Sequence, residues 1–124
     1  KKQDSEQMIL ELKGIKGGDQ QDTEHLLMKV VKNGNLSGYA VIDNTFNSDG
    51  SLSNVHRHFY AFPSCEVKEG DFVRLYTKTG TYNSTDNRAE TKTHNFFWNL
   101  RVFVWNTDDT AVLLKVIDST KKKL

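Results

Sequence analysis

The sequence predicts an all-β protein whose short strands pack as a sandwich or a barrel. Short apolar runs, separated by polar turns rich in glycine and asparagine, dominate the chain of 124 residues. Apolar residues nowhere recur at the three- and four-residue spacing of an amphipathic helix for more than a couple of turns. The runs also follow one another too evenly for an α/β fold, which needs helical crossovers between parallel strands.

The expected strands are ordered along the chain with clear turn signals between them. They are "MILELKGI", "HLLMKVV", "YAVID", "VHRHFYAF" and "FVRLYTK", followed by an aromatic block and "DTAVLLKVI". Pro63 ends the fourth run because its nitrogen cannot donate to a β-ladder. Two polar stretches, "NTFNSDGSLSN" and residues 79–93, show no periodicity and are expected to be loops.

The aromatic block is expected to fill the core. Five of the 13 aromatic rings lie between Phe96 and Trp105. The single cysteine, Cys65, rules out an internal disulfide, so the fold must rest on packing, to which each buried ring contributes a few kcal/mol. The residues predicted to form the structural core are Tyr39, Phe72, Trp98, Trp105, Val112 and Leu114.

The last run has apolar residues on both faces, which predicts a strand well inside a sheet. One face would carry Thr110, Val112, Leu114 and Val116, and the other Ala111, Leu113 and Ile117.

Composition limits the function classes. Seventeen basic and sixteen acidic residues leave a net charge of +1, which argues against a protein built mainly to hold nucleic acid. No stretch is long and apolar enough to span a membrane. A lone cysteine cannot form a cysteine-based zinc site, and Cys65 is interpreted as an unpaired thiol. We expect one domain over residues 8–118, with flexible ends at 1–7 and 119–124.

Three segments together resemble a known family. "LSGYAVID", "HRHFYAFPSCEVKEGDFVRLYTKTG" and "FVWNTDDTAVLLKV" occur in the order seen in the lamin-tail domain, the immunoglobulin-like module of nuclear lamins and of many bacterial surface and secreted proteins. Tyr39 stands where the family usually has tryptophan, and Asp108 where it has glycine. The resemblance implies an immunoglobulin-like β-sandwich of about seven to nine short strands.

The resemblance also implies an interaction module without common catalytic residues. We therefore expect a non-catalytic protein-interaction or scaffolding module, without a cofactor, on an extracytoplasmic (periplasmic, cell-surface or secreted) bacterial protein. Its partner would be another protein, which the sequence does not identify. The chain lacks the "HExxH", "GxSxG" and phosphate-binding glycine motifs of common enzyme classes.

Two alternatives stay open. Arg101 and Phe103, with Arg74 and Tyr76 from another strand and a contribution from Phe97, could form a stacking surface for a sugar or single-stranded nucleic acid.

The second alternative is a metal-dependent hydrolase. His56 and His58 share one face of a strand and could ligate a metal, with Asp43 or Asp49 as a third ligand. An exposed strand face with polar histidines explains the same spacing. The acidic stretches "NSDG" and "NTDD" lack the spaced carboxylates of a calcium loop, and turn formation accounts for them better.

Overall fold

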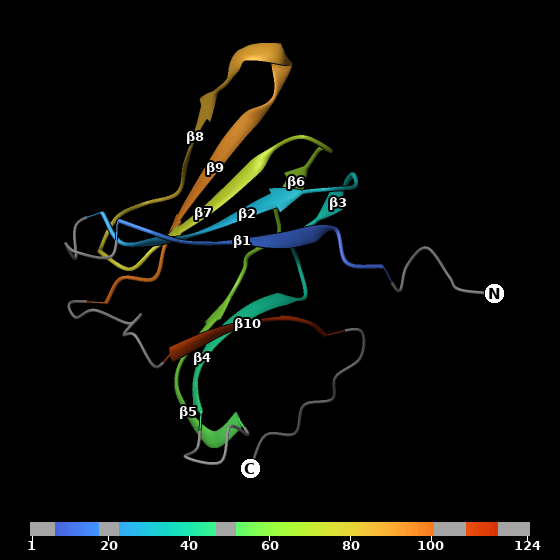
Figure 1. Cartoon of the computed structure of the whole chain (residues 1–124). Coiled ribbons are helices and arrows are strands. Elements are labelled where there is room, and N and C mark those ends of the chain that lie inside the picture. The colour runs from blue at the N-terminus through green and yellow to red at the C-terminus, as the bar shows by residue number, and fades with distance from the viewer. Residues whose placement is uncertain (1–6, 18–22, 47–51, 101–108, 117–124) are drawn as a thin grey trace, which may run out of the picture.

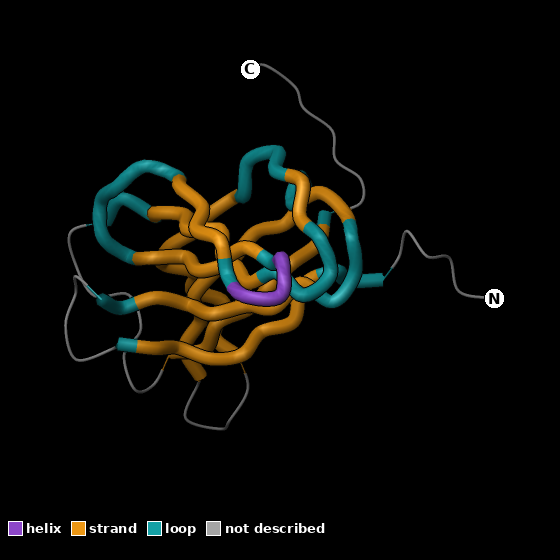
Figure 2. Tube along the Cα trace, turned by 90° about the horizontal axis from the view of Figure 1, so that it is seen from above, coloured by secondary structure: helices purple, strands orange, loops and turns teal. Residues whose placement is uncertain are grey.

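The prediction of an all-β fold is confirmed. The computed structural model describes residues 7–17, 23–46, 52–100 and 109–116. These residues form strands, connecting loops and one short 3₁₀ turn at Arg88–Glu90 (Figure 2). The strands are β1 (Leu10–Lys16), β2 (His25–Val30), β3 (Gly34–Asn35), β4 (Tyr39–Phe46), β5 (Leu52–Ala61), β6 (Glu66–Val67), β7 (Phe72–Tyr76), β8 (Asn83–Asp86), β9 (Lys92–Phe97) and β10 (Asp109–Lys115).

The strands form three sheets (Figure 1). The largest has five strands in the order β1-β2-β7-β9-β8, with β7 and β9 parallel and the other neighbours antiparallel. A second, antiparallel sheet has the order β10-β4-β5, and β3 pairs with β6 in a short third one. Figure 1 shows the five-stranded sheet above the three-stranded one, with β3 and β6 beside the larger sheet.

Both larger sheets contribute to a single hydrophobic core. β2 and β7 direct alternate side chains into it, β9 contributes Phe96, and Tyr39 and Val41 enter from β4. Tyr39 is 2% exposed and Trp98 9% exposed, so these two members of the predicted core lie inside. Trp105 is outside the described residues. The core residues are Ile9, Leu10, Leu26, Met28, Val30, Leu36, Tyr39, Val41, Phe62, Val67, Val73, Leu75, Phe96 and Trp98.

The position predicted for the last run was wrong. β10 lies at one end of the order β10-β4-β5 in the described sheet, rather than between two strands. Leu113 packs against the core, whereas Leu114 is 37% exposed and Val112 is half-buried. Apolar residues on both faces predicted burial on both, but the core covers only the face that carries Leu113.

Phe72 is a second correction to the predicted core. Along β7, Val73 and Leu75 are buried, and Phe72, Arg74 and Tyr76 are half-buried. Alternation along a strand sends the two sets to opposite faces. Phe72 therefore lies on the outer face of the five-stranded sheet, because its neighbour Val73 takes the inward position.

The polar stretch 79–93 is more regular than predicted. It contains β8 and the first residues of β9, which pair antiparallel from Asn83 opposite Asn95 to Asp86 opposite Lys92. All four residues of β8 are exposed, so the strand has no apolar face for periodicity to reveal. Main-chain pairing with β9 forms this strand, and side-chain pattern carries no signal of that pairing.

Candidate functional site

The residues predicted to form a stacking surface are only partly described. Arg74 and Tyr76 lie on the outer face of the five-stranded sheet, and both are half-buried. Arg101 and Phe103 are outside the described residues. Phe97 pairs with Tyr76 in the parallel β7–β9 ladder, so these two rings lie side by side.

The described rings of this surface contact one another. Tyr76 stacks on Phe97 with centroids 5.4 Å apart and planes 16° apart, and His25 lies 4.8 Å from Tyr76. The ammonium of Lys78 lies 5.3 Å from the Tyr76 centroid. A Cβ added at Gly80 would lie 2.5 Å from the Phe97 ring, so the loop covers that ring closely. Intramolecular contacts thus occupy much of the ring surface that a base or sugar would need.

His58 and Asp43 come together, as one version of the metal hypothesis required. The main-chain N–H of His58 donates to Asp43 Oδ1 at 2.7 Å, and His58 Nδ1 lies 3.3 Å from Asp43 Oδ2. The side chain of His56 and the whole of Asp49 are outside what the structure describes. Within the described part of the chain, no three histidine, cysteine or acidic side chains converge as a metal site would require.

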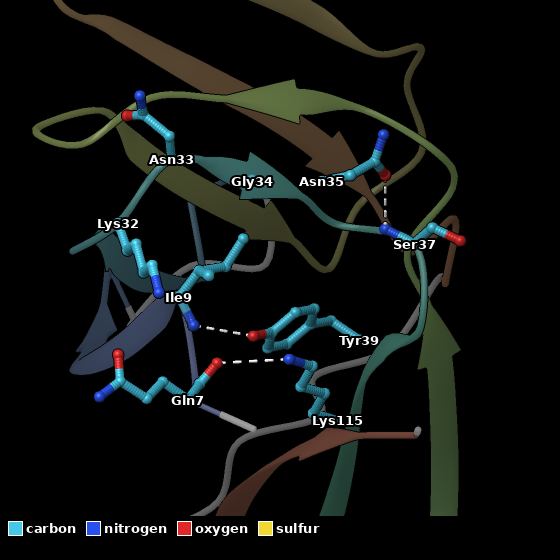
Figure 3. A pocket seen from close by; sticks show the side chains of 9 residues that line it. All are labelled: Gln7, Ile9, Lys32, Asn33, Gly34, Asn35, Ser37, Tyr39 and Lys115. Carbon is cyan, nitrogen blue, oxygen red and sulfur yellow. Dashed lines mark hydrogen bonds between the residues drawn. The ribbon is translucent and has the colours of Figure 1, made fainter. Parts of the chain in front are cut away.

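A hollow of about 320 Å³ lies where the chain entering β1 meets β3, β4 and β10 (Figure 3). Ile9 and Tyr39 form its apolar floor, and the Tyr39 hydroxyl accepts the main-chain N–H of Ile9 at 2.7 Å. Lys115 donates to the carbonyl of Gln7 at 3.3 Å and lies 5.8 Å from the Tyr39 ring centroid. Lys32 approaches the same floor beside Ile9. The lining residues are Gln7, Ile9, Lys32, Asn33, Gly34, Asn35, Ser37, Tyr39 and Lys115.

Asparagine side chains hold the wall of this hollow in place. Asn35 Oδ1 accepts the main-chain N–H groups of Ser37 at 2.8 Å and Cys65 at 3.2 Å. Asn33 Oδ1 accepts the main-chain N–H of Glu69 at 2.7 Å. These bonds tie the β3 segment to the segment carrying β6, so the wall is preorganised.

A second pocket, of about 400 Å³, lies between the β6–β7 turn and strands β8 and β9. His94 connects two of its side chains: its Nε2 lies 2.9 Å from Asp71 Oδ2, and its Nδ1 lies 3.0 Å from the Tyr82 hydroxyl. The Cys65 sulfur lies 3.9 Å from both His94 Nδ1 and the Tyr82 hydroxyl oxygen. A thiol, a hydroxyl, an imidazole and a carboxylate therefore form one connected group.

Asp71 holds this group in place through its hydrogen bonds. Gly70, at φ +95°, supplies the left-handed residue of the turn before it. The carboxylate accepts main-chain N–H groups from Lys68 at 3.0 Å and Lys92 at 2.9 Å, in addition to the His94 contact. Burial by itself would raise the pKa of Asp71, but hydrogen bonds from His94, Lys68 and Lys92 outweigh it and lower that pKa.

The Tyr82 hydroxyl keeps its proton in this setting. Partial burial raises the pKa of Tyr82, and its contacts with Cys65 raise it further. The negative charge of Asp71 acts in the same direction. Tyr82 can therefore donate to His94 Nδ1 while accepting from the Cys65 thiol.

Sequence reasoning missed both pockets. Cys65 was interpreted as an unpaired thiol because nothing near it in the sequence is a base, and His94 is 29 residues away. The sequence does indicate a turn at "KEGD" before the strand "FVRLYTK", and Asp71 stands at the end of that turn. No pattern in the sequence indicates that Lys32 and Lys115 meet on one hollow.

Comparison of the chain with models of protein families, with curated proteins and with solved structures finds no match. In the described residues, no helix has the length and apolar character needed to cross a membrane.

Proposed function

We propose that this chain is a non-catalytic interaction module of lamin-tail type that binds an acidic segment of a partner protein in the hollow of Figure 3. The ordered motifs around Tyr39, Pro63 and Asp109 support the lamin-tail assignment and, with it, an immunoglobulin-like sandwich. The all-β fold with a core shared by two sheets agrees with this proposal. The same resemblance favours a cell-surface or secreted bacterial protein.

The charge of the hollow carries the proposal. Two lysines, Lys32 and Lys115, line it, and none of its nine described lining residues is acidic. Their ammonium groups approach the floor from different strand ends (Figure 3). A carboxylate placed between them would gain attraction from both charges, at a site only partly open to screening solvent.

The floor of the hollow fits a peptide better than a free inorganic anion. Ile9 and Tyr39 are 7% and 2% exposed and present an apolar base below the charges. A glutamate side chain would place its methylenes on that base and its carboxylate at the lysines. Binding sites commonly combine an apolar lining with a few convergent polar groups in this way.

The experiment uses the full chain and two matched peptides, acetylated tetraglutamate and acetylated tetraglutamine, followed by amide shifts in NMR spectra. We expect the glutamate peptide to shift amides around Ile9, Gly34 and Tyr39, and the glutamine peptide to leave them unchanged. Each partly exposed ion pair stabilises binding by up to about 1 kcal/mol, so the variant Lys32→Gln with Lys115→Gln should bind roughly tenfold more weakly.

A second double variant, Lys13→Gln with Lys29→Gln, removes the same charge away from the hollow and should bind as the parent does. The proposal fails if the glutamate peptide shifts no amide at the hollow. It also fails if both double variants lose affinity equally, because the effect would then be one of net charge.

A further inference from the structure

The second pocket is a separate place where chemistry can occur, and it does not depend on the proposed binding function. It brings a half-buried thiol, Cys65, to 3.9 Å from an imidazole nitrogen. Its volume of about 400 Å³ gives a small molecule room beside the sulfur. A nucleophile, a base and a group that orients the base are the three parts of an activated nucleophile.

The hydrogen bonds fix which nitrogen of His94 can act as the base. Asp71 is ionised, since the pKa of its carboxyl is lowered, and it can only accept hydrogen bonds. His94 Nε2, 2.9 Å away, must therefore carry a proton, and in the neutral imidazole the lone pair then lies on Nδ1. That nitrogen faces Tyr82 and Cys65, so the thiol proton can reach it directly or through the Tyr82 hydroxyl.

The charges around the pocket indicate what kind of molecule would enter. Asp71, Glu66 and Glu90 line it together with Lys68 and Lys92, so three acidic and two basic side chains line the pocket that holds the sulfur. A ligand that carries carboxylates and ammonium groups at once would match both signs. Low-molecular-weight disulfides built from amino acids have this zwitterionic character.

We propose that Cys65 is a reactive thiol that exchanges with a small zwitterionic disulfide, with His94 as the base and Asp71 as the group that orients it. The Cys65 proton moves to His94 Nδ1, and the thiolate attacks one sulfur of the ligand. A new bond to Cys65 Sγ forms as the ligand's own S–S bond breaks. The leaving thiolate takes the proton back from His94.

Electrons balance in this step because one disulfide replaces another. The ligand disulfide is the oxidant, and one of its halves leaves as a free thiol. Since Cys65 is the only cysteine of the chain, no second thiol within the chain can resolve the product. The mixed disulfide therefore persists until an external thiol removes it, which makes Cys65 a reversible modification site.

The test measures the rate of mixed-disulfide formation by intact mass on the full chain at neutral pH. The probes are oxidised glutathione and the neutral bis(2-hydroxyethyl) disulfide, and Cys65→Ser provides the blank. We expect the native chain to react faster than the urea-unfolded chain. We also expect the ratio of the rate with oxidised glutathione to the rate with the neutral disulfide to be larger for the native chain. Because the 3.9 Å contact is long, His94→Gln should slow the native reaction by roughly tenfold to a hundredfold, at or below the low end for general-base catalysis.

Native and unfolded chains of the unaltered protein are compared with both probes, so the test stands even where His94→Gln weakens the fold. Equal rates for the native and unfolded chains would overturn the proposal. So would a folded His94→Gln variant that reacts at the parent's rate. These readouts concern Cys65 alone, and they are independent of peptide binding at Lys32 and Lys115.

Discussion

Replacing Asp71 should destabilise the fold more than replacing any exposed acidic residue. Asp71 is 4% exposed, and its carboxylate accepts three hydrogen bonds, from the main chain at Lys68 and Lys92 and from His94 Nε2. Asp71→Ala leaves all three donors without their acceptor, and each buried unsatisfied donor costs about 1–3 kcal/mol. The exposed side of the turn lets water reach the Lys68 amide, so we expect a total loss of about 3 kcal/mol, near the low end of that sum.

Urea unfolding followed by tryptophan fluorescence measures this loss. With a slope of about 2 kcal/mol per molar urea, the midpoint should fall by about 1.5 M. Asp86→Ala is the matched control, because Asp86 is exposed on β8 and should change stability by no more than about 0.5 kcal/mol. A loss below about 1 kcal/mol for Asp71→Ala, or one no larger than that of the control, would refute the inference that the hydrogen bonds of Asp71 hold this region in place.

The loss of folding stability at low pH provides a second measurement of the contribution of Asp71. Hydrogen bonds hold the pKa of Asp71 below its ordinary value, so the unfolded chain binds a proton here more readily than the folded chain does. The stabilisation is therefore present at neutral pH, and it is lost as pH falls through the unfolded value of about 3.9 toward the lower folded value. In the Asp71→Ala variant, the free energy of unfolding should therefore change less with pH over this range.

Three further predictions concern positions elsewhere in the fold. Leu113→Ala should cost about 2 kcal/mol because Leu113 packs on the core, whereas Leu114→Ala should cost less than about 1 kcal/mol; equal midpoints in urea would contradict the assigned faces of β10. Gly80→Ala should lower stability by about 1–3 kcal/mol in thermal unfolding, since the new methyl meets the Phe97 ring; an unchanged transition would show that the ring yields freely. Burial and the nearby positive charge of Arg74 lower the pKa of His25, so its ring protons should titrate below pH 6.5 in NMR spectra, and a midpoint at or above that value would count against its place beside Tyr76.

Local sequence was enough to predict the class of fold. The runs "HLLMKVV" and "FVRLYTK" are short, apolar and bounded by turn signals, and both became strands with one buried face, β2 and β7. Tyr39 and Trp98 were expected inside, and both are buried in the core. The absence of helical periodicity correctly indicated a chain built from strands.

Contacts between strands determined two features that the local sequence pattern did not predict: the strand β8 and the covered face of β10. β8 has no apolar face, so only its pairing with β9 shows it to be a strand. Leu113 and Leu114 are equally apolar, and the position of the core below β10 determines which one is covered.

By itself, the sequence determined that this protein is all-β, that a single core must hold it together without disulfides, and that its charges nearly cancel. Tertiary structure alone decided the hollow of Figure 3 and the pocket beside Cys65. Lys32 and Lys115 line one hollow, and Cys65 lies beside His94, across distances along the chain that no local pattern spans. Strand formation depends on neighbours a few residues apart, whereas a pocket depends on which strands pair and in what register.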